Sequence, residues 1–248
     1  MRSTLEVLFS PAEYQARRNG GFADSVCVVF DVLRATSVMV TGLANGAAGF
    51  APVEEIAEAI QVRPRYPDAL LAGERNGLRI NASLSGGGEF DFGNSPREYT
   101  ADRVRGRTII TTTTNGTRAL RACATAPAVG ICSFLNLTAT ARWLKELLPP
   151  RITLICAGTG ECTALEDVLC AGALAEELQG AILEDSALLA GSTYRESNTN
   201  LLAAIATSRN AQRLLANEDL RADVEFCLQR DIHHFSAGLE PDGLIRRI

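Results

Sequence analysis

The segment at residues 108–120 reads TIITTTTNGTRAL and combines the two signals that decide the fold class. Its first half is β-branched, which is typical of a buried strand. The threonines then give way to Asn115 and Gly116 and to the apolar spacing of a helix. A buried strand that passes through a short polar turn into a helix is the building unit of parallel α/β sheets.

The same unit recurs at residues 25–30 (SVCVVF), 128–134 (AVGICSF) and 151–158 (RITLICAG). We therefore expect an α/β protein, layered α/β/α, with a largely parallel or mixed sheet. In open parallel sheets, ligands bind beyond the carboxyl ends of the strands. The residues directly after these strands become the site candidates: Asp31, Arg34, Asn115, Arg118, Asn136 and residues 158–167.

The composition is that of an ordinary globular protein, with 248 residues, 46% hydrophobic and 21% charged. We expect one domain over residues 1–248, and the sequence leaves open two closely packed lobes at about 1–180 and 181–248. Residues 71–99 are rich in glycine and carry few strand or helix signals, so a long loop or lid is expected there.

Charge and hydropathy restrict the class of partner. The net charge is −5 and basic residues do not cluster, so no nucleic-acid partner is expected. The sequence shows no signal peptide and no run of about 18 apolar residues, so we expect a cytoplasmic protein without a membrane partner. The oligomeric state is left open, with a homodimer as one alternative.

Two other site classes find little support. The seven cysteines lie mostly in apolar segments and are expected to be reduced core residues. A zinc site at Cys156, Cys162 and Cys170 is disfavoured because the sequence contains no C-x-x-C pair. The two histidines, His233 and His234, lie in a segment without a nucleophile signature.

Asp31 and Arg34, in DVLRAT, lie three residues apart where a strand gives way to a helix. A carboxylate there suits Mg²⁺ binding or nucleophilic attack, and a guanidinium suits a two-point grip on phosphate. The alternative is an Asp that caps the helix and an Arg on the surface.

Residues 113–116 allow two readings as well. Hydroxyls and backbone N–H groups at a strand end can form an anion-binding nest, which would make Thr113, Thr114 and Gly116 phosphate ligands. The alternative is β-propensity followed by an Asn-Gly turn. Arg118 favours the first reading, since a cation in the first helical turn opposes the helix dipole.

Three further segments contain polar candidates with structural alternatives. In residues 158–172 (GTGECTALEDVLCAG), Glu166 has capping-box spacing from Thr163, whereas Asp167 is the better metal-ligand candidate. Ser95 precedes Pro96 and is either a helix cap or a ligand. Glu74 and Arg75 alternate along an extended segment, so only one of them should enter a site.

In their order and spacing, DVLRAT, GER, FDFGNSP, TTTNGTRAL, SFLN and CAGT followed by LEDVLCAG resemble the 2-phosphosulfolactate phosphatase (ComB-type) family, from about residue 26 to 172. The resemblance implies an α/β enzyme that uses Mg²⁺ to hydrolyse (2R)-2-phospho-3-sulfolactate to sulfolactate and phosphate, a step in coenzyme M biosynthesis. Asn76 stands where the family usually has glycine, and Cys162-Thr163 replaces a more typical aromatic residue.

Together these observations assign a role to each candidate. We expect Asp31 and Asp167 to hold Mg²⁺, with Glu74 or Glu166 as a third ligand. Arg34 and Arg118 would hold the phosphoryl oxygens, with Asn115 beside them in the catalytic group, and Arg75 and Asn94 would hold the sulfonate or carboxylate. The remaining substrate contacts are expected from Ser95, Thr113, Thr114, Gly116 and Asn136.

The attacking group stays open between water and Asp31 itself. Two other functions also stay open. One is a phosphatase of another small phosphorylated hydroxy acid, and the other is a non-catalytic phosphometabolite-binding protein.

Overall fold

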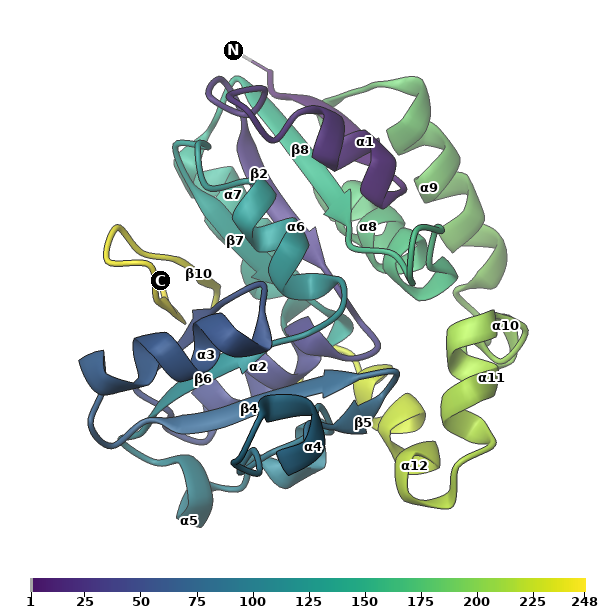
Figure 1. The fold of residues 1–248 in the computed structure, drawn as a ribbon. Coiled ribbons are helices and arrows are strands. Elements are labelled where there is room, and N and C mark those ends of the chain that lie inside the picture. The colour runs from purple at the N-terminus through teal and green to yellow at the C-terminus, as the bar shows by residue number, and fades with distance from the viewer. Residues whose placement is uncertain (1) are drawn as a thin grey trace.

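The computed structural model describes residues 2–248 and is built around one eleven-stranded sheet, in the order β5-β4-β6-β3-β11-β10-β7-β2-β8-β1-β9 (Figure 1). The strands are β1 (Thr4–Leu8), β2 (Val26–Phe30), β3 (Gly49–Pro52), β4 (Leu70–Arg75), β5 (Leu78–Arg79), β6 (Thr108–Thr112), β7 (Val129–Cys132), β8 (Arg151–Cys156), β9 (Ile182–Leu183), β10 (Ala237–Leu239) and β11 (Ile245–Arg247).

Helices connect most of these strands. The α-helices are α1 (Pro11–Ala16), α2 (Ala35–Ala44), α3 (Ile56–Val62), α4 (Ala82–Ser85), α5 (Ala101–Val104), α6 (Gly116–Ala122), α7 (Leu137–Leu147), α8 (Leu165–Glu177), α9 (Asp185–Ser197), α10 (Leu201–Ile205), α11 (Arg209–Leu215) and α12 (Glu218–Cys227). Short 3₁₀ turns lie at η1 (Arg63–Arg65), η2 (Pro96–Glu98) and η3 (Phe134–Asn136). None of the helices in residues 2–248 combines the length and the hydropathy needed to cross a membrane.

The sheet is mixed and contains two parallel groups. One group is β4, β6 and β3, and the other is β7, β2, β8, β1 and β9. The antiparallel hairpin β10–β11 lies between them and pairs antiparallel with β7 on one side and β3 on the other. Because three antiparallel pairings separate the groups, the two groups run in opposite directions. The four strands expected from the sequence are confirmed as β2, β6, β7 and β8.

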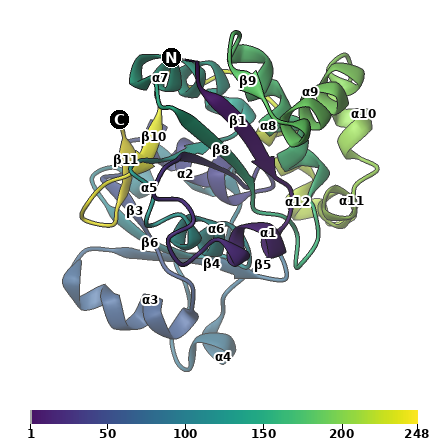
Figure 2. The same ribbon diagram turned by 90° about the horizontal axis from the view of Figure 1, so that it is seen from above.

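Side-chain alternation along β2 shows why the fold is layered. Val26, Val28 and Phe30 belong to the core that contains α7, α8 and α9, whereas Cys27 and Val29 belong to the core that contains α1, α2 and α6. Successive strand residues point to opposite faces of a sheet, so helices cover this group on both faces. Seen from above, α3 lies beside the β3–β6–β4 group and α8 to α10 lie on the opposite side of the molecule (Figure 2). The layered α/β/α expectation is confirmed.

Residues 71–99 differ from the expected structureless loop. They contain most of β4, then β5, α4 and η2. Strand β4 pairs with β6 in the interior of the sheet, so its glycine and charged residues are strand residues. The cysteine expectation holds for six of the seven, which are buried and free, while Cys162 is exposed.

Candidate active site

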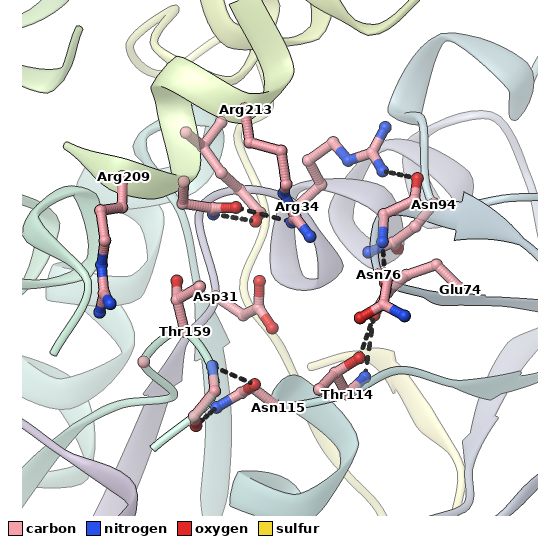
Figure 3. Close-up of a pocket in the computed structure, with 15 residues that line it drawn as sticks. Asp31, Arg34, Glu74, Asn76, Asn94, Thr114, Asn115, Thr159, Arg209 and Arg213 are labelled. Carbon is pink, nitrogen blue, oxygen red and sulfur yellow. Dashed lines mark hydrogen bonds between the residues drawn. The ribbon is translucent and has the colours of Figure 1, made fainter. Parts of the chain in front are cut away.

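A cavity of about 340 Å³ opens where the carboxyl ends of strands from both parallel groups meet (Figure 3). Asp31 follows β2, Glu74 lies near the end of β4, Thr114 follows β6 and Gly158 follows β8. Helix α11 contributes a further wall through Arg209, Asn210 and Arg213. The remaining lining residues are Leu33, Arg34, Asn76, Gly77, Asn94, Asn115, Thr159 and Gly160.

Asp31 lines the cavity and also contacts the start of α2. Its Oδ1 accepts a hydrogen bond from the backbone N–H of Ala35 at 3.1 Å, at the start of α2. The pKa of Asp31 is raised to about 7, mainly by burial and also by the charges of Glu74 and Glu166, while the Ala35 N–H and Arg34 act in the opposite direction. A carboxylate in this setting gains from a nearby cation.

Gly116 allows this placement of Asp31. A Cβ atom at position 116 would lie 2.6 Å from Oδ2 of Asp31 and 2.7 Å from Cβ of Ala35. Both distances are shorter than van der Waals contact. Gly116 does not line the cavity, and its contribution is the space that it leaves for the carboxylate.

Glu74 and Arg75 point to opposite sides of β4, as their alternation predicted. Glu74 is buried and lines the cavity, where Oε1 accepts hydrogen bonds from the N–H and the hydroxyl of Thr114, both at 2.9 Å. Its Oε2 accepts the N–H of Gly77 at 2.6 Å. Arg75 instead donates to carbonyls of its own and neighbouring strands and to Oγ1 of Thr112 at 3.0 Å. The structure therefore places Arg75 outside the cavity.

Arg34 lines the cavity with a buried guanidinium that is held on two sides. Nη1 donates to Oδ2 of Asp223 at 2.7 Å, and Nη2 donates to the carbonyl of Gly77 at 2.9 Å. Ser95 donates to the other oxygen of Asp223 at 2.7 Å. Ser95 thus neither caps η2 nor reaches the cavity, and it fixes the partner of Arg34.

The threonine-rich turn after β6 does not form an open anion nest. The N–H of Thr113 donates to Oγ1 of Thr117 at 3.2 Å, and the N–H of Thr114 donates to Oε1 of Glu74. Asn115 donates to the carbonyls of Ala157 and Gly160 and accepts the N–H of Gly160. Thr114 and Asn115 line the cavity, and their hydrogen bonds fix its walls.

Two further predicted residues, Arg118 and Asn136, also lie away from the cavity. Arg118 forms an ion pair with Glu161 at 3.0 Å on the surface. Asn136 is fully buried, where Oδ1 accepts the N–H of Ser133 at 3.0 Å and its amide nitrogen donates to Thr140 at 3.2 Å. These contacts give Asn136 a structural role at the start of η3.

Glu166 and Asp167 are buried in the first turn of α8 but do not line the cavity. Asp167 accepts the N–H groups of Val32 at 2.8 Å and of Gly158 at 3.0 Å, and so ties the segments after β2 and β8 together. Burial, followed by the charges of Asp31 and Glu166, raises its pKa well above the ordinary value. Glu166 accepts from Asn210 at 2.8 Å and Ser208 at 3.2 Å, so it does not form the capping box with Thr163 that was the alternative to a metal-ligand role.

The four predicted carboxylate ligands do not converge. Within residues 2–248, no group of three or more His, Cys, Asp or Glu side chains is arranged to hold a metal ion. Mg²⁺ is, however, usually bound through one or two carboxylates together with waters and substrate phosphates. Asp31 and Glu74 supply two carboxylates in the cavity wall, and this donor set fits such a partly hydrated Mg²⁺.

Helix α11 contains three of the cavity residues that sequence reasoning missed. Arg209 and Arg213 line the cavity at helical spacing i, i+4, and Asn210 lies between them. The available signal was a pair of like charges one helical turn apart without an acidic neighbour. Asn76, also missed as a site residue, has φ +54°, a conformation that glycine and asparagine tolerate best, which explains Asn where the family usually has Gly.

Comparisons with known proteins agree on one family. The profile of the 2-phosphosulpholactate phosphatase family matches residues 12–238. A probable 2-phosphosulfolactate phosphatase of Caldicellulosiruptor saccharolyticus is 38% identical over 218 residues, covering 84% of this chain and 86% of the relative. A relative with the same name from Pseudothermotoga lettingae is 35% identical over 243 residues, covering 98% and 99%.

A third relative with that name, from Thermotoga petrophila, is 40% identical over 205 residues, covering 83% of this chain and 85% of the relative. The matched regions include every strand that contributes to the cavity, since the family profile extends from α1 to β10. The chain therefore belongs to the 2-phosphosulfolactate phosphatase family and is a phosphoric monoester hydrolase.

Proposed function

We propose that the protein hydrolyses (2R)-2-phospho-3-sulfolactate to (2R)-3-sulfolactate and inorganic phosphate. The observation that supports this most is the pairing of acidic and basic groups in one small cavity: Asp31 and Glu74 share it with Arg34, Arg209 and Arg213. Phosphoryl transfer needs little beyond positioning and neutralisation of charge around the transferring group. A simple anion receptor would gain nothing from the two carboxylates, so the combination favours catalysis.

The two cavity carboxylates give the enzyme its expected metal dependence. Asp31 and Glu74 would hold Mg²⁺, which when bound supplies positive charge to the phosphoryl oxygens. Glu74 is oriented for this by Thr114 and Gly77, and Asp31 by the first turn of α2. Both carboxylates are thus positioned before any ligand arrives.

Arg34 is the residue best placed to orient the phosphoryl group. A guanidinium has five N–H donors, and the structure assigns one to Asp223 and one to Gly77. The remaining donors lie on a side chain whose position is fixed by a buried ion pair. Arg34 can therefore donate to phosphoryl oxygens without first being ordered.

The rest of the cavity wall is rigid for identifiable reasons. Asn115 fastens the segment from Ala157 to Gly160, and Asp167 fastens Gly158 to the segment after β2. These contacts keep the wall at a constant distance from Asp31. We also propose that the reaction belongs to coenzyme M biosynthesis, as the family resemblance implies, and that it takes place in the cytoplasm.

Phosphate release from a panel of phosphorylated hydroxy acids, with and without Mg²⁺, tests the proposal. We expect phosphosulfolactate to be hydrolysed with the highest kcat/KM and only in the presence of the divalent cation. Hydrolysis of phospholactate or phosphoglycerate with equal or higher efficiency would assign the enzyme to another hydroxy acid. Binding without turnover of any member would contradict the catalytic assignment.

A further inference from the structure

We propose that Arg209 and Arg213 of α11 bind the sulfonate and the carboxylate of the substrate, the two acid groups that are not hydrolysed. The inference rests on the proposed function, because it assigns parts of that same substrate to residues of this chain. It also replaces Arg75, which the sequence suggested for this role and whose guanidinium donates to Glu54 and Thr112 outside the cavity.

The position of α11 gives both arginines access to the cavity. Residues at i and i+4 lie on the same face of a helix, and both Arg209 and Arg213 are exposed residues that line the cavity. The opposite face of α11 is anchored, because Ala211 and Leu214 are buried in the main core. The exposed arginines are therefore carried by a helix with a fixed orientation.

Polar contacts fix the start of α11 to residues 31–34, the segment that contains Asp31 and Arg34. Asn210 donates to the carbonyl of Leu33 at 2.9 Å and to Glu166 at 2.8 Å. Ser208 caps the helix by accepting the N–H of Ala211 at 3.2 Å and donates to Glu166. Since Leu33 lies between Asp31 and Arg34, these contacts hold α11 and residues 31–34 together.

Within the described residues, the two arginines lack acidic partners, unlike Arg34 in the cavity and Arg118 outside it. Arg34 is paired with Asp223 and Arg118 with Glu161. Within residues 2–248, no carboxylate oxygen lies within 4.0 Å of the guanidinium nitrogens of Arg209 or Arg213. Among the described residues, Arg213 donates only to the amide oxygen of Asn210, at 2.8 Å. Their positive charge is thus available to an anionic ligand.

Gly77 shows how close two of these cations lie. The guanidinium of Arg34 donates to its carbonyl at 2.9 Å. A Cβ atom at the same residue would lie 3.3 Å from Cζ of Arg213. Figure 3 shows Arg213 beside Arg34, whereas Arg209 lies apart from both. Asp223 balances only one of the two neighbouring charges, so an anion bound beside Arg213 would relieve the repulsion.

The charges of the cavity and of the substrate match group by group. Asp31, Glu74 and Arg34 are assigned to the metal and the phosphoryl group, which leaves Arg209 and Arg213 for two remaining anions. Carboxylate and sulfonate oxygens can both accept two parallel N–H donors from one guanidinium. A phosphorylated acid with two further acid groups is therefore the class of substrate that uses the whole cavity.

The test compares three substrates in the intact enzyme: phosphosulfolactate, phospholactate, which lacks the sulfonate, and the phosphate ester of 2-hydroxyethanesulfonate, which lacks the carboxylate. The variants are Arg209→Gln, Arg213→Gln and the double variant. Arg65→Gln removes one exposed charge in η1, and Gln212→Ala alters α11 outside the cavity lining. These two serve as controls for charge and for helix stability.

Each arginine variant should lower kcat/KM for phosphosulfolactate by about 10-fold or more, because a charge-assisted contact is lost. On the substrate that lacks the group bound by a given arginine, replacing that arginine should lower kcat/KM only about as much as the control substitutions do. Equal losses on all three substrates, or losses no larger than the controls show, would overturn the proposal.

Calorimetric binding of the product sulfolactate separates this inference from the proposed function. If the unmodified protein hydrolyses none of the three substrates, the proposed function fails. Sulfolactate binding that is lost in the double variant but kept in Arg65→Gln would still support the arginine assignment. Absent binding, or binding unchanged in the double variant, would overturn it.

Discussion

Oδ2 of Asp223 accepts a hydrogen bond from Nη1 of Arg34 at 2.7 Å, and this buried contact joins residues 189 positions apart in the sequence. The other oxygen of Asp223 accepts from Ser95 at 2.7 Å and from Nε of Arg97 at 2.8 Å. One carboxylate on α12 thus holds the proposed phosphoryl-binding arginine and the segment around η2. The C-terminal helices are part of the site through this contact.

Replacing Asp223 with Ala should destabilise the protein strongly. The buried guanidinium of Arg34 would lose its counter-charge, which costs about 3–5 kcal/mol when one partner of a buried pair is removed. Urea denaturation measures this as a lower midpoint. Asp219→Ala is the matched control on the same helix, since its backbone carbonyl rather than its carboxylate contacts Arg97. Equal midpoints for the two variants would show that the buried pair contributes little.

Replacing Asp31 with Asn should reduce kcat by about 100-fold or more, because the lost interaction is electrostatic at the reacting centre. The amide oxygen can still accept the N–H of Ala35, so the start of α2 should be preserved. Circular dichroism and thermal melting check the fold, and phosphate release checks turnover. Near-normal turnover would show that Asp31 only caps the helix and takes no part in catalysis.

Chelation of divalent cations should abolish turnover, and added Mg²⁺ should restore it. The physical reason is that Asp31 and Glu74 face an anionic substrate in the same cavity, and a bound cation offsets that repulsion. Atomic absorption confirms that the chelated protein is metal-free. Undiminished phosphate release by a preparation shown to contain no metal would contradict the proposed site.

The metal-free protein should lose stability as the pH rises towards 7. Burial raises the pKa of Asp31 from the usual 3.8 to about 7, so between these values the folded state holds a proton that the unfolded state has released. Stability from this group is therefore fully present below pH about 4 and is lost as the pH passes through about 7. Thermal melting in chelator from pH 4 to 8 measures the trend.

Asp31→Asn isolates the contribution of this group to the pH trend, because the amide does not titrate. The unmodified protein should lose more stability than the variant between pH 4 and 7. Asp167 has a pKa raised in the same direction, so part of the slope should remain in the variant. Identical slopes would show that Asp31 does not titrate abnormally.

Replacing Gly116 with Ala should reduce both stability and turnover, although alanine favours helices. The added Cβ would lie 2.6 Å from Oδ2 of Asp31, so the carboxylate or α6 must move. Overpacking of this kind typically costs about 1–3 kcal/mol. Gly88→Ala is the control, because nothing lies within 4 Å of its added Cβ. Full activity in Gly116→Ala would show that the exact position of Asp31 is unimportant.

Much of the fold could be predicted because local patterns and tertiary structure agree. The β-branched runs at β2, β6, β7 and β8 are buried strands in the structure, and polar turns and helices follow them as expected. The antiparallel hairpin β10–β11 was not predicted, since three-residue strands carry too little pattern to be recognised. Strand β4 was missed for another reason, because its sequence LLAGER ends in charged residues that serve the site.

Most of the cavity residues that were predicted lie close to a recognised strand end. Asp31, Arg34, Thr114 and Asn115 line the cavity as expected, and Glu74 and Asn94 do too. Asp167 and Asn136 occupy similar positions in sequence, but their side chains are turned towards backbone and buried polar groups. Spacing along the chain does not distinguish a side chain that faces a cavity from one that forms hydrogen bonds within the cavity wall or the core.

The arginines of α11 could not be found in that way, because their place depends on contacts far apart in the sequence. Asn210 meets Leu33 across 177 positions and Glu166 across 44. Residues 208–213 taken alone have the composition of an ordinary exposed helix. Only the tertiary structure shows that this helix closes the cavity.

The hairpin β10–β11 lies in the middle of the sheet, yet it follows every other strand in sequence order. During synthesis, the strands on either side of it emerge first and have no hydrogen-bonded connection through the sheet until residues 237–247 arrive. Pairings between such distant segments form slowly, because the chain must close large loops before any contact compensates. The continuous sheet should therefore form only after residues 237–247 have been made, because this hairpin supplies the hydrogen bonds that join the two parallel groups of strands.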